Sequence, residues 1–78
     1  MRVLLFAGLA EALGCRELSW PDSSSPATVG QFEAALREGE PRLAAACFRV
    51  AVNQRYARPE DALAPDDEVA LIPPVGGG

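Results

Sequence analysis

The sequence contains no histidine and no lysine, and each absence excludes a class of chemistry. Histidine is the usual general base and the commonest metal ligand in proteins, so most acid–base and metal-dependent active sites are excluded. Without lysine the chain cannot form a Schiff base with a carbonyl substrate, nor be linked to a second copy of itself through a side-chain amine. We therefore do not expect an enzyme that works alone.

Positive charge is also scarce. The seven basic residues, all of them arginine, stand against eleven acidic residues, which gives a net charge of −4 at pH 7. A protein that binds nucleic acid needs a basic surface to neutralise phosphates, and an anionic membrane attracts the same kind of surface. The sequence therefore predicts binding to neither.

Long apolar runs and cysteines are few. The apolar run at residues 3–10 is far shorter than the ~20 residues that cross a bilayer. Because Glu11 interrupts it and because it is the best candidate strand, we do not interpret it as a signal sequence.

Cys15 and Cys47 are expected to be free thiols of a cytoplasmic protein, since nothing else is typical of secretion. Cys47 is expected to be a buried, small apolar side chain.

The chain has 78 residues, of which 49% are hydrophobic, enough for one small globular domain. Residues 2–7 form a strand-length run that is apolar on both faces, which predicts a central strand covered on both sides. Residues 8–14 fit a short helix bounded by glycine. Polar and apolar residues alternate over 16–20, which predicts a second strand with Leu18 and Trp20 on one face.

The main helix begins after Thr28, which forms a capping box with Gln31. Gly39 is expected at the C′ position, just past the helix end, and Pro41 prevents continuation. An apolar stripe along the helix is formed by Val29, Phe32, Ala35 and Leu36.

In the second half of the chain, residues 42–47 are expected to form further helical turns. Residues 48–53 are expected to form a strand, because large apolar side chains alternate with other residues there. A turn at Asn53 leads to a returning segment at Tyr56, and residues 68–72 form the last strand. This order predicts an α+β fold of the β-grasp, or ubiquitin-like, type: a mixed sheet with one main helix packed across it. The first and last strands are expected to pair in the centre of the sheet.

Several side chains outside these patterns have a structural interpretation. Trp20 and Phe32 are expected in the core, whereas Phe6 suits either the core or a partner-facing surface. Arg55 and Arg58 are expected on a solvated face. An acidic group is expected to form a solvated loop that could steer a basic partner, rather than a metal site: Glu60, Asp61, Asp66, Asp67 and Glu68.

The ending Pro-Pro-Val-Gly-Gly-Gly carries the clearest chemical signal. Pro73 and Pro74 cannot donate to a strand ladder, so the sheet ends there. Glycine allows an enzyme to close around the backbone from every side. We therefore divide the chain into a β-grasp domain, 1–73, and a flexible glycine-rich tail, 74–78.

The tail ends in a carboxylate whose pKa is roughly 3.5. Transfer of AMP from ATP would convert this carboxylate of Gly78 into an anhydride that a sulfur donor can attack, giving a thiocarboxylate. Gly78 is then the reactive group. The segment that a partner would accommodate comprises Pro74, Val75, Gly76 and Gly77.

From end to end the sequence resembles the small sulfur-carrier subunits of molybdopterin synthase, the MoaD-like family. The resemblance rests on VLLFAGLAEALG at 3–14, on VAVNQRYA at 50–57 and most specifically on DDEVALIPPVGGG at 66–78. Gly77 and Gly78 match the terminal pair of the family, whereas Gly76 stands where the family is more variable.

The resemblance implies the β-grasp fold and a set of partners. An E1-like adenylating enzyme would activate Gly78 with ATP, and a sulfurtransferase would supply the sulfur. The large catalytic subunit of molybdopterin synthase would receive the tail in a heterotetramer and pass sulfur to a pterin precursor of the molybdenum cofactor. The resemblance implies no cofactor bound to this chain, since ATP is used by the adenylating partner.

Three alternatives remain open from the residues themselves. The same carrier chemistry could serve another pathway, such as thiazole synthesis or tRNA thiolation. The chain could be a protein modifier joined through its C-terminus to lysines of other proteins. It could also be an interaction domain with an inert tail.

Overall fold

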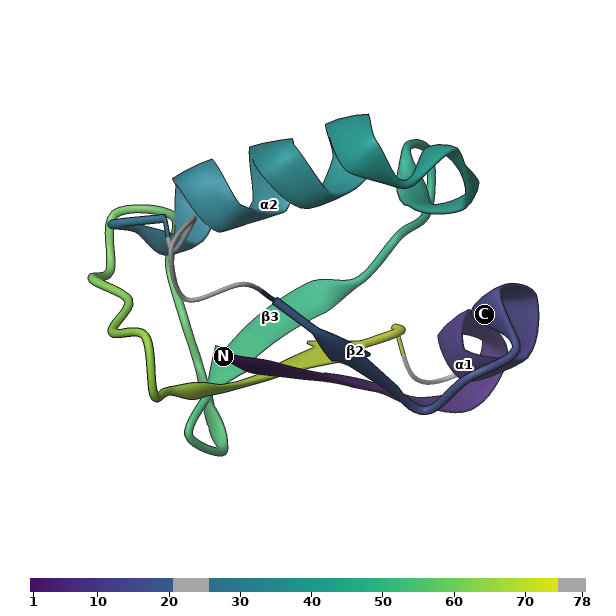
Figure 1. Cartoon of the computed structure of the whole chain (residues 1–78), viewed down its shortest axis with the longest axis horizontal. Helices are drawn as coiled ribbons and strands as arrows, with labels where there is room; N and C mark the ends of the chain where they lie inside the picture. Colours follow the sequence, from purple (N-terminus) through teal and green to yellow (C-terminus); the bar gives the residue numbers. More distant parts are fainter. Residues whose placement is uncertain (21–25, 75–78) are drawn as a thin grey trace.

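The computed structural model describes residues 1–20 and 26–74. Within them, five strands form a mixed sheet in the order β2-β1-β5-β3-β4, and the main helix crosses one face of it (Figure 1). No helix in this described part has the length and apolarity needed to cross a membrane. The elements in chain order are β1 Arg2–Leu5, α1 Ala7–Leu13, β2 Glu17–Ser19, α2 Val29–Gly39, the 3-10 helix η2 Pro41–Leu43, β3 Arg49–Val52, β4 Arg55–Tyr56 and β5 Glu68–Ile72.

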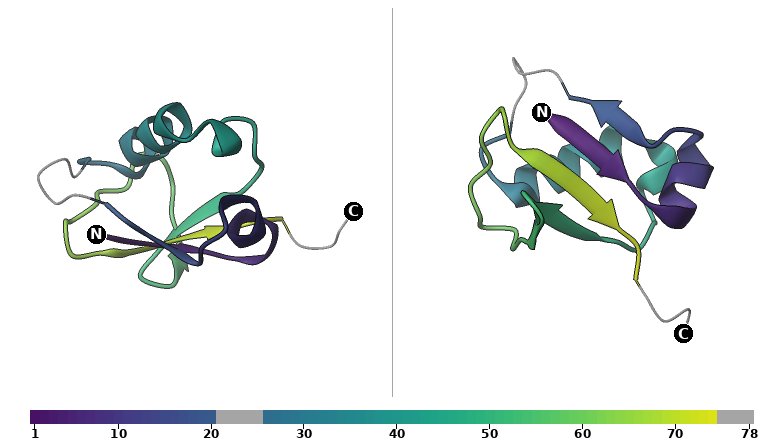
Figure 2. Two further views of the ribbon diagram at one scale, coloured as in Figure 1. Left: turned by 45° about the vertical axis from the view of Figure 1, so that its right-hand side comes forward. Right: turned by 90° about the horizontal axis from the view of Figure 1, so that it is seen from below.

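The first and last strands lie side by side in the middle of the sheet (Figure 2). β1 and β5 run parallel, and Val3 is opposite Val69 while Leu5 is opposite Leu71. All other strand pairs are antiparallel. The predicted central pairing and the β-grasp fold are therefore confirmed.

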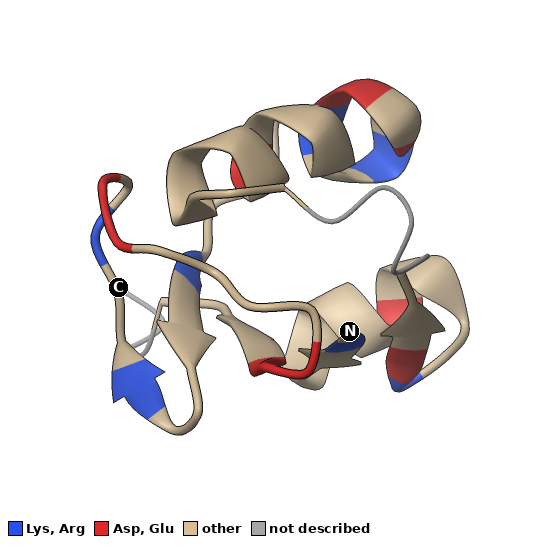
Figure 3. Ribbon diagram, turned by 60° about the vertical axis from the view of Figure 1, so that its left-hand side comes forward, with Lys and Arg blue, Asp and Glu red and all other residues tan. Residues whose placement is uncertain are grey.

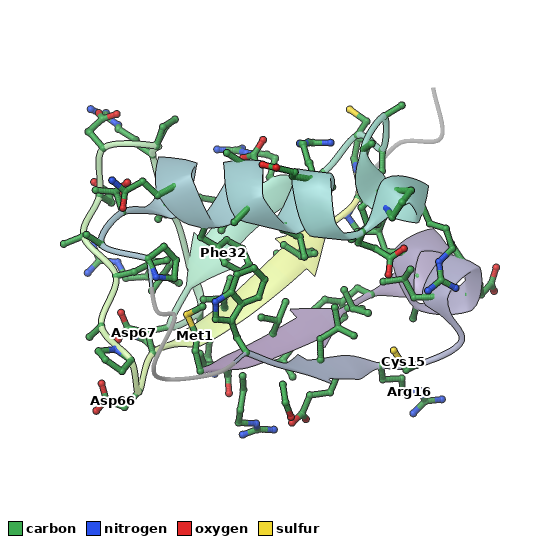
Figure 4. All side chains as sticks on the ribbon, turned by 45° about the horizontal axis from the view of Figure 1, so that its top comes forward. Met1, Cys15, Arg16, Phe32, Asp66 and Asp67 are labelled. Carbon is green, nitrogen blue, oxygen red and sulfur yellow. The ribbon has the colours of Figure 1, made fainter. Side chains whose placement is uncertain are left out.

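The core lies between the sheet and α2, with Phe32 at its centre (Figure 4). Val29, Phe32 and Leu36 of the predicted stripe are buried, whereas Ala35, also in the stripe, is exposed. At about 100° per residue, Ala35 stands at the margin of the stripe and faces the edge of the sheet at β2. The Trp20 ring packs on Phe32 with their centroids 5.0 Å apart, although Trp20 itself is only half-buried.

Both ends of α2 differ in detail from the sequence prediction. The Thr28 hydroxyl accepts the N–H of Gln31 at 3.2 Å, but the Gln31 side chain accepts the N–H of Ala27 instead of that of Thr28. Gly39 is the last helical residue and not the C′ residue, because Pro41 holds Glu40 in an extended conformation. The N–H of Glu40 still donates to the carbonyl of Leu36.

Arg37 organises the segment between α2 and β3. Its Nη1 donates to the carbonyls of Leu43, Ala44 and Ala46 at 2.9, 3.3 and 2.8 Å, and its Nε donates to Glu33. The chain therefore curls around the guanidinium after η2 instead of continuing as the helical turns predicted for residues 42–47. This path leaves Cys47 exposed, and its predicted burial was wrong.

The contacts of Arg37 predict a measurable contribution to stability. The substitution Arg37→Met keeps most of the apolar stem but leaves three carbonyls without their donor, so we expect a loss of about 1–3 kcal/mol in the free energy of unfolding. Arg58→Met is the matched control, because the Arg58 side chain makes no hydrogen bond or ion pair to the described residues. Urea unfolding of both variants tests this, and equal midpoints would contradict it.

Candidate functional site

The tail begins at the end of the central strand β5. β5 ends at Ile72, and Pro73 is half-buried while Pro74 is exposed. Because proline lacks the N–H that a sheet ladder requires, the chain leaves the sheet here. Of the predicted site residues, Pro74 is thus exposed at the start of the tail. Val75, Gly76, Gly77 and Gly78 lie outside the described residues.

None of the helices described covers the other face of the sheet, as the left view of Figure 2 shows. This surface is hollowed by a cavity of about 490 Å³. Its apolar side chains come from four strands and from the residue after β1. We call this surface the open face, and it comprises Leu4, Phe6, Ala51, Tyr56, Ala70 and Ile72.

The sequence left the position of Phe6 undecided, and it predicted that β1 is covered on both sides. The structure places Phe6 on the open face with 46% of its surface exposed, and Tyr56 is 56% exposed. β1 is therefore covered on one side only, and the predicted cover on both sides was wrong. Val3 and Leu5 face α2, whereas Leu4 lies on the open face. An apolar outer face without a helix is typical of a binding surface.

The open face continues to the start of the tail. A second hollow, of about 340 Å³, is lined by Phe6, Ala7, Ile72, Pro73 and Pro74. Ala7 has a φ of 50°, a left-handed conformation that costs a residue with a side chain about 1–2 kcal/mol. This bend turns the chain from β1 into α1 directly beside the exit of β5. The start of the tail at Pro74 and the open face are therefore continuous.

Arginines frame the open face. The guanidinium of Arg49 stacks over the Tyr56 ring at 4.0 Å from its centroid. At the other side, Arg2 lies between two carboxylates, 3.1 Å from Glu17 and 3.8 Å from Glu68. The hydrogen bond from Arg2 lowers the pKa of Glu17. Arg2, Glu17 and Glu68 thus form ion pairs at the rim of the open face, and the side chains at its centre are apolar.

In the acidic loop before β5, which has Asp66 and Asp67 at its turn (Figure 4), the carboxylates of Asp61 and Asp67 accept backbone N–H groups. Asp67 accepts the N–H of Ala64 at 2.8 Å and the side-chain amide of Asn53 at 3.0 Å. The backbone N–H of Ala64, followed by the Asn53 side chain, lowers the pKa of Asp67. No group of three or more metal-ligating side chains occurs in the part of the chain described.

The turn before this loop depends on a backbone conformation that the sequence signalled only in part. Asn53 and Gln54 both have positive φ values, 51° and 70°, which is the pattern of a tight hairpin turn between β3 and β4. The side chain of Asn53 also accepts the N–H of Glu68 at 3.0 Å, so it ties the turn to the start of β5. The turn positions Tyr56 opposite Ala51 on the open face.

Comparisons with known proteins identify relatives over the whole chain. A family model described as the ThiS family matches residues 3–78. A molybdopterin synthase sulfur carrier subunit from Chlamydomonas reinhardtii is 36% identical over 83 residues, which covers 100% of this chain and 98% of that protein.

Solved structures show the same fold. The crystal structure of SAMP1 from Haloferax volcanii has a TM-score of 0.74 and 34% identity, covering 99% of this chain and 97% of that chain. The solution structure of the small archaeal modifier protein 1 from Methanosarcina acetivorans has a TM-score of 0.79 and 27% identity, covering 99% of this chain and 94% of that chain.

The hydrogen bonds of Asp67 predict a pH-dependent contribution to stability. Its pKa is lower in the folded chain than the ~3.9 of an unfolded aspartate, so the contribution is fully present above that value. It is lost as the pH falls through the folded pKa. We therefore expect Asp67→Ala to be less stable than the wild type at pH 7, and we expect this difference to shrink in acid.

Asp66→Ala is the matched control, because Asp66 is the exposed neighbour in the same loop. Thermal unfolding from pH 7 down to pH ~2.5 covers the titration range of aspartate. A difference for Asp67→Ala that stays constant over this range would contradict the assignment.

Proposed function

This chain belongs to the ThiS family, and from that premise we propose that it is the small sulfur-carrier subunit of a molybdopterin synthase. The family match confirms the resemblance drawn from the sequence motifs. The expectation of a carrier subunit that is not itself catalytic agrees with the relative from Chlamydomonas reinhardtii, which is a sulfur carrier subunit. In this proposal the β-grasp domain is recognised by partners and Gly78 carries the sulfur.

The proposed chemistry balances without an oxidant. The Gly78 carboxylate attacks the α-phosphorus of ATP bound to an E1-like adenylating enzyme, and pyrophosphate leaves. Hydrosulfide, released by a thiol reductant from the persulfide of a sulfurtransferase, then attacks the carbonyl carbon and loses its proton to solvent. The C–S bond forms, the C–O bond to AMP breaks, and a thiocarboxylate results.

The observation that carries the proposal is the continuity between the open face and the exit of the tail. A partner that encloses the tail must lie close to Phe6 and Ile72, because these residues line the same hollow as Pro73 and Pro74. Burial of exposed aromatic side chains at the centre of an interface is a frequent source of binding energy. The open face would thus hold the adenylating enzyme during loading and the large synthase subunit during delivery.

Conversion of the C-terminal carboxylate into a thiocarboxylate, which we call loading, tests the role of the two terminal glycines. Incubation with ATP, the adenylating enzyme and a sulfur source should raise the intact mass by one exchange of oxygen for sulfur. Removal of Gly77 and Gly78 together should abolish this shift, because the carboxylate then ends roughly 7 Å short of the reacting groups. The unfolding midpoint should stay the same, since no described core residue is removed.

The matched control is Gly76→Ala, which adds one methyl group but keeps the length and the terminal pair, so it should still give the mass shift. Deletion of a single glycine is less informative, because the shortened chain still ends in two glycines. Loading of the chain that lacks Gly77 and Gly78 would overturn the assignment of the reactive carboxylate.

The substitution Phe6→Asp tests the open face. Phe6 is the N-cap residue of α1 and makes no side-chain cap hydrogen bond, and aspartate is favoured at this position, so the fold should be retained. The affinity for the adenylating enzyme should fall at least about 30-fold, the effect of losing an interface hot spot of ~2 kcal/mol. Ala45→Asp puts the same charge on an exposed residue after η2 and should bind as the wild type does; equal affinities of the two variants would contradict docking at the open face.

A second function is favoured by the solved structures. SAMP1 from Haloferax volcanii, at 34% identity, and the small archaeal modifier protein 1 from Methanosarcina acetivorans share this fold over nearly their whole length. The same activated Gly78 could react with an amine of another protein, which would make this chain a protein modifier. The two functions share the activation step and differ in the acceptor.

A further inference from the structure

The charges on the open face differ between its two ends. At the end where β1 begins, Arg2 is paired with Glu17 and Glu68. At the end where the tail leaves, which we call the tail end, Arg49 of β3 is opposite Ile72 of β5. Residues opposite each other in a sheet lie on the same side of it, so Arg49 belongs to the open face. It forms no ion pair with a described residue.

The Tyr56 ring holds the Arg49 guanidinium in position at the surface. The guanidinium carbon lies 4.0 Å from the centroid of the ring, and 56% of Tyr56 is exposed. A guanidinium that stacks on a ring keeps the N–H groups along its edge available, and their fork matches the two oxygens of a carboxylate. Because the ring already orients the side chain, Arg49 loses less conformational freedom when it binds.

A second arginine stands at the tail end on the opposite side of Phe6. Arg16 and Phe6 line the same hollow, which has a volume of about 430 Å³, and Figure 4 shows Arg16 on the side of the sheet away from α2. The carbonyl of Arg16 accepts the N–H of Leu5 at 2.9 Å, which fixes its backbone beside the end of β1. Across the sheet, Phe6 and Ile72 therefore lie between Arg16 and Arg49.

Neither arginine is balanced by a carboxylate in the described part of the chain. Arg16, like Arg49, forms no ion pair there. Residues 49–58 contain three arginines and no acidic residue, as the colours of Figure 3 show. Glu11 on α1 is exposed and forms no ion pair with either arginine. Arginines thus prevail at the tail end, although the whole chain has a net charge of −4.

Building on the proposed function, we propose that the adenylating enzyme covers the open face with an apolar surface whose rim carries aspartate or glutamate, placed to meet Arg49 and Arg16. One carboxylate accepts the N–H groups of Arg49 while Phe6 and Ile72 are buried beside it. Activation of Gly78 is common to the carrier and the modifier functions, so either function requires this partner. The two arginines act in docking and select the partner, and the chemistry stays at Gly78.

The test measures the affinity of the full chain for the adenylating enzyme by calorimetry without ATP. Arg49→Met keeps most of the apolar stem and removes the charge, so affinity should fall about tenfold. Arg49→Glu places a like charge against the acidic rim, and the fall should be about a hundredfold. Raising the salt to about 0.3 M should weaken the wild type more than the double variant Arg16→Met, Arg49→Met.

Arg42→Met is the matched control, because it removes the same charge from η2, on the side of the sheet that α2 covers (Figure 1). It should bind within about twofold of the wild type. Loading kinetics give a second measurement, in which the loss for Arg49→Met should appear in KM for the chain and not in kcat. Urea unfolding checks that each variant is folded; if Arg49→Glu is not, Arg49→Met decides.

Four results would overturn the inference. They are equal affinities of Arg49→Met and Arg42→Met, a wild-type affinity that does not change with salt, no binding of the wild type to the enzyme, and a loss that appears in kcat alone. Wild-type chain that binds tightly but is never loaded would instead overturn the proposed function, and the comparison of affinities would still decide the role of Arg49. Sedimentation of the free chain identifies the remaining occupant: self-association that Arg49→Met abolishes would assign the open face to a second copy and overturn the inference.

Discussion

The parallel pairing of β1 with β5 determines where the functional parts of this chain lie. Parallel strands end at the same edge of the sheet, so the segment that leaves β1 and the tail that leaves β5 emerge side by side. The inner side chains of these strands, such as Val3 and Leu71, make the core with α2. Their outer side chains, with Phe6 and Ile72, make the apolar surface beside the tail. The pairing of β1 with β5 thus both builds the core and places the open face beside the start of the tail.

Much of the fold could be predicted because its signals are local. The alternation of apolar and polar residues over 16–20 and 48–53 and the cap at Thr28 depend on neighbouring residues only. The position of Cys47 was predicted wrongly because it depends on tertiary contacts. Cys47 is exposed because the guanidinium of Arg37 binds the carbonyls before it.

The candidate site could be predicted only in part. The terminal glycines are visible as a motif, but the open face is assembled from strands distant in the sequence. The apolar run of β1 predicted cover on both sides, and Leu4 instead faces a surface without a helix. The outer side of that strand contributes to the open face and not to the core beneath α2.

The measurement that tests the central claim most directly follows the sulfur after loading. The thiocarboxylated chain is mixed with the large synthase subunit and the cyclic pterin precursor, and intact masses of all proteins are recorded over time. The account predicts that the chain returns to the mass of its free carboxylate while sulfur appears in the pterin. A thiocarboxylate that persists with the pterin unchanged, or a chain that becomes linked to amines of other proteins, would contradict it.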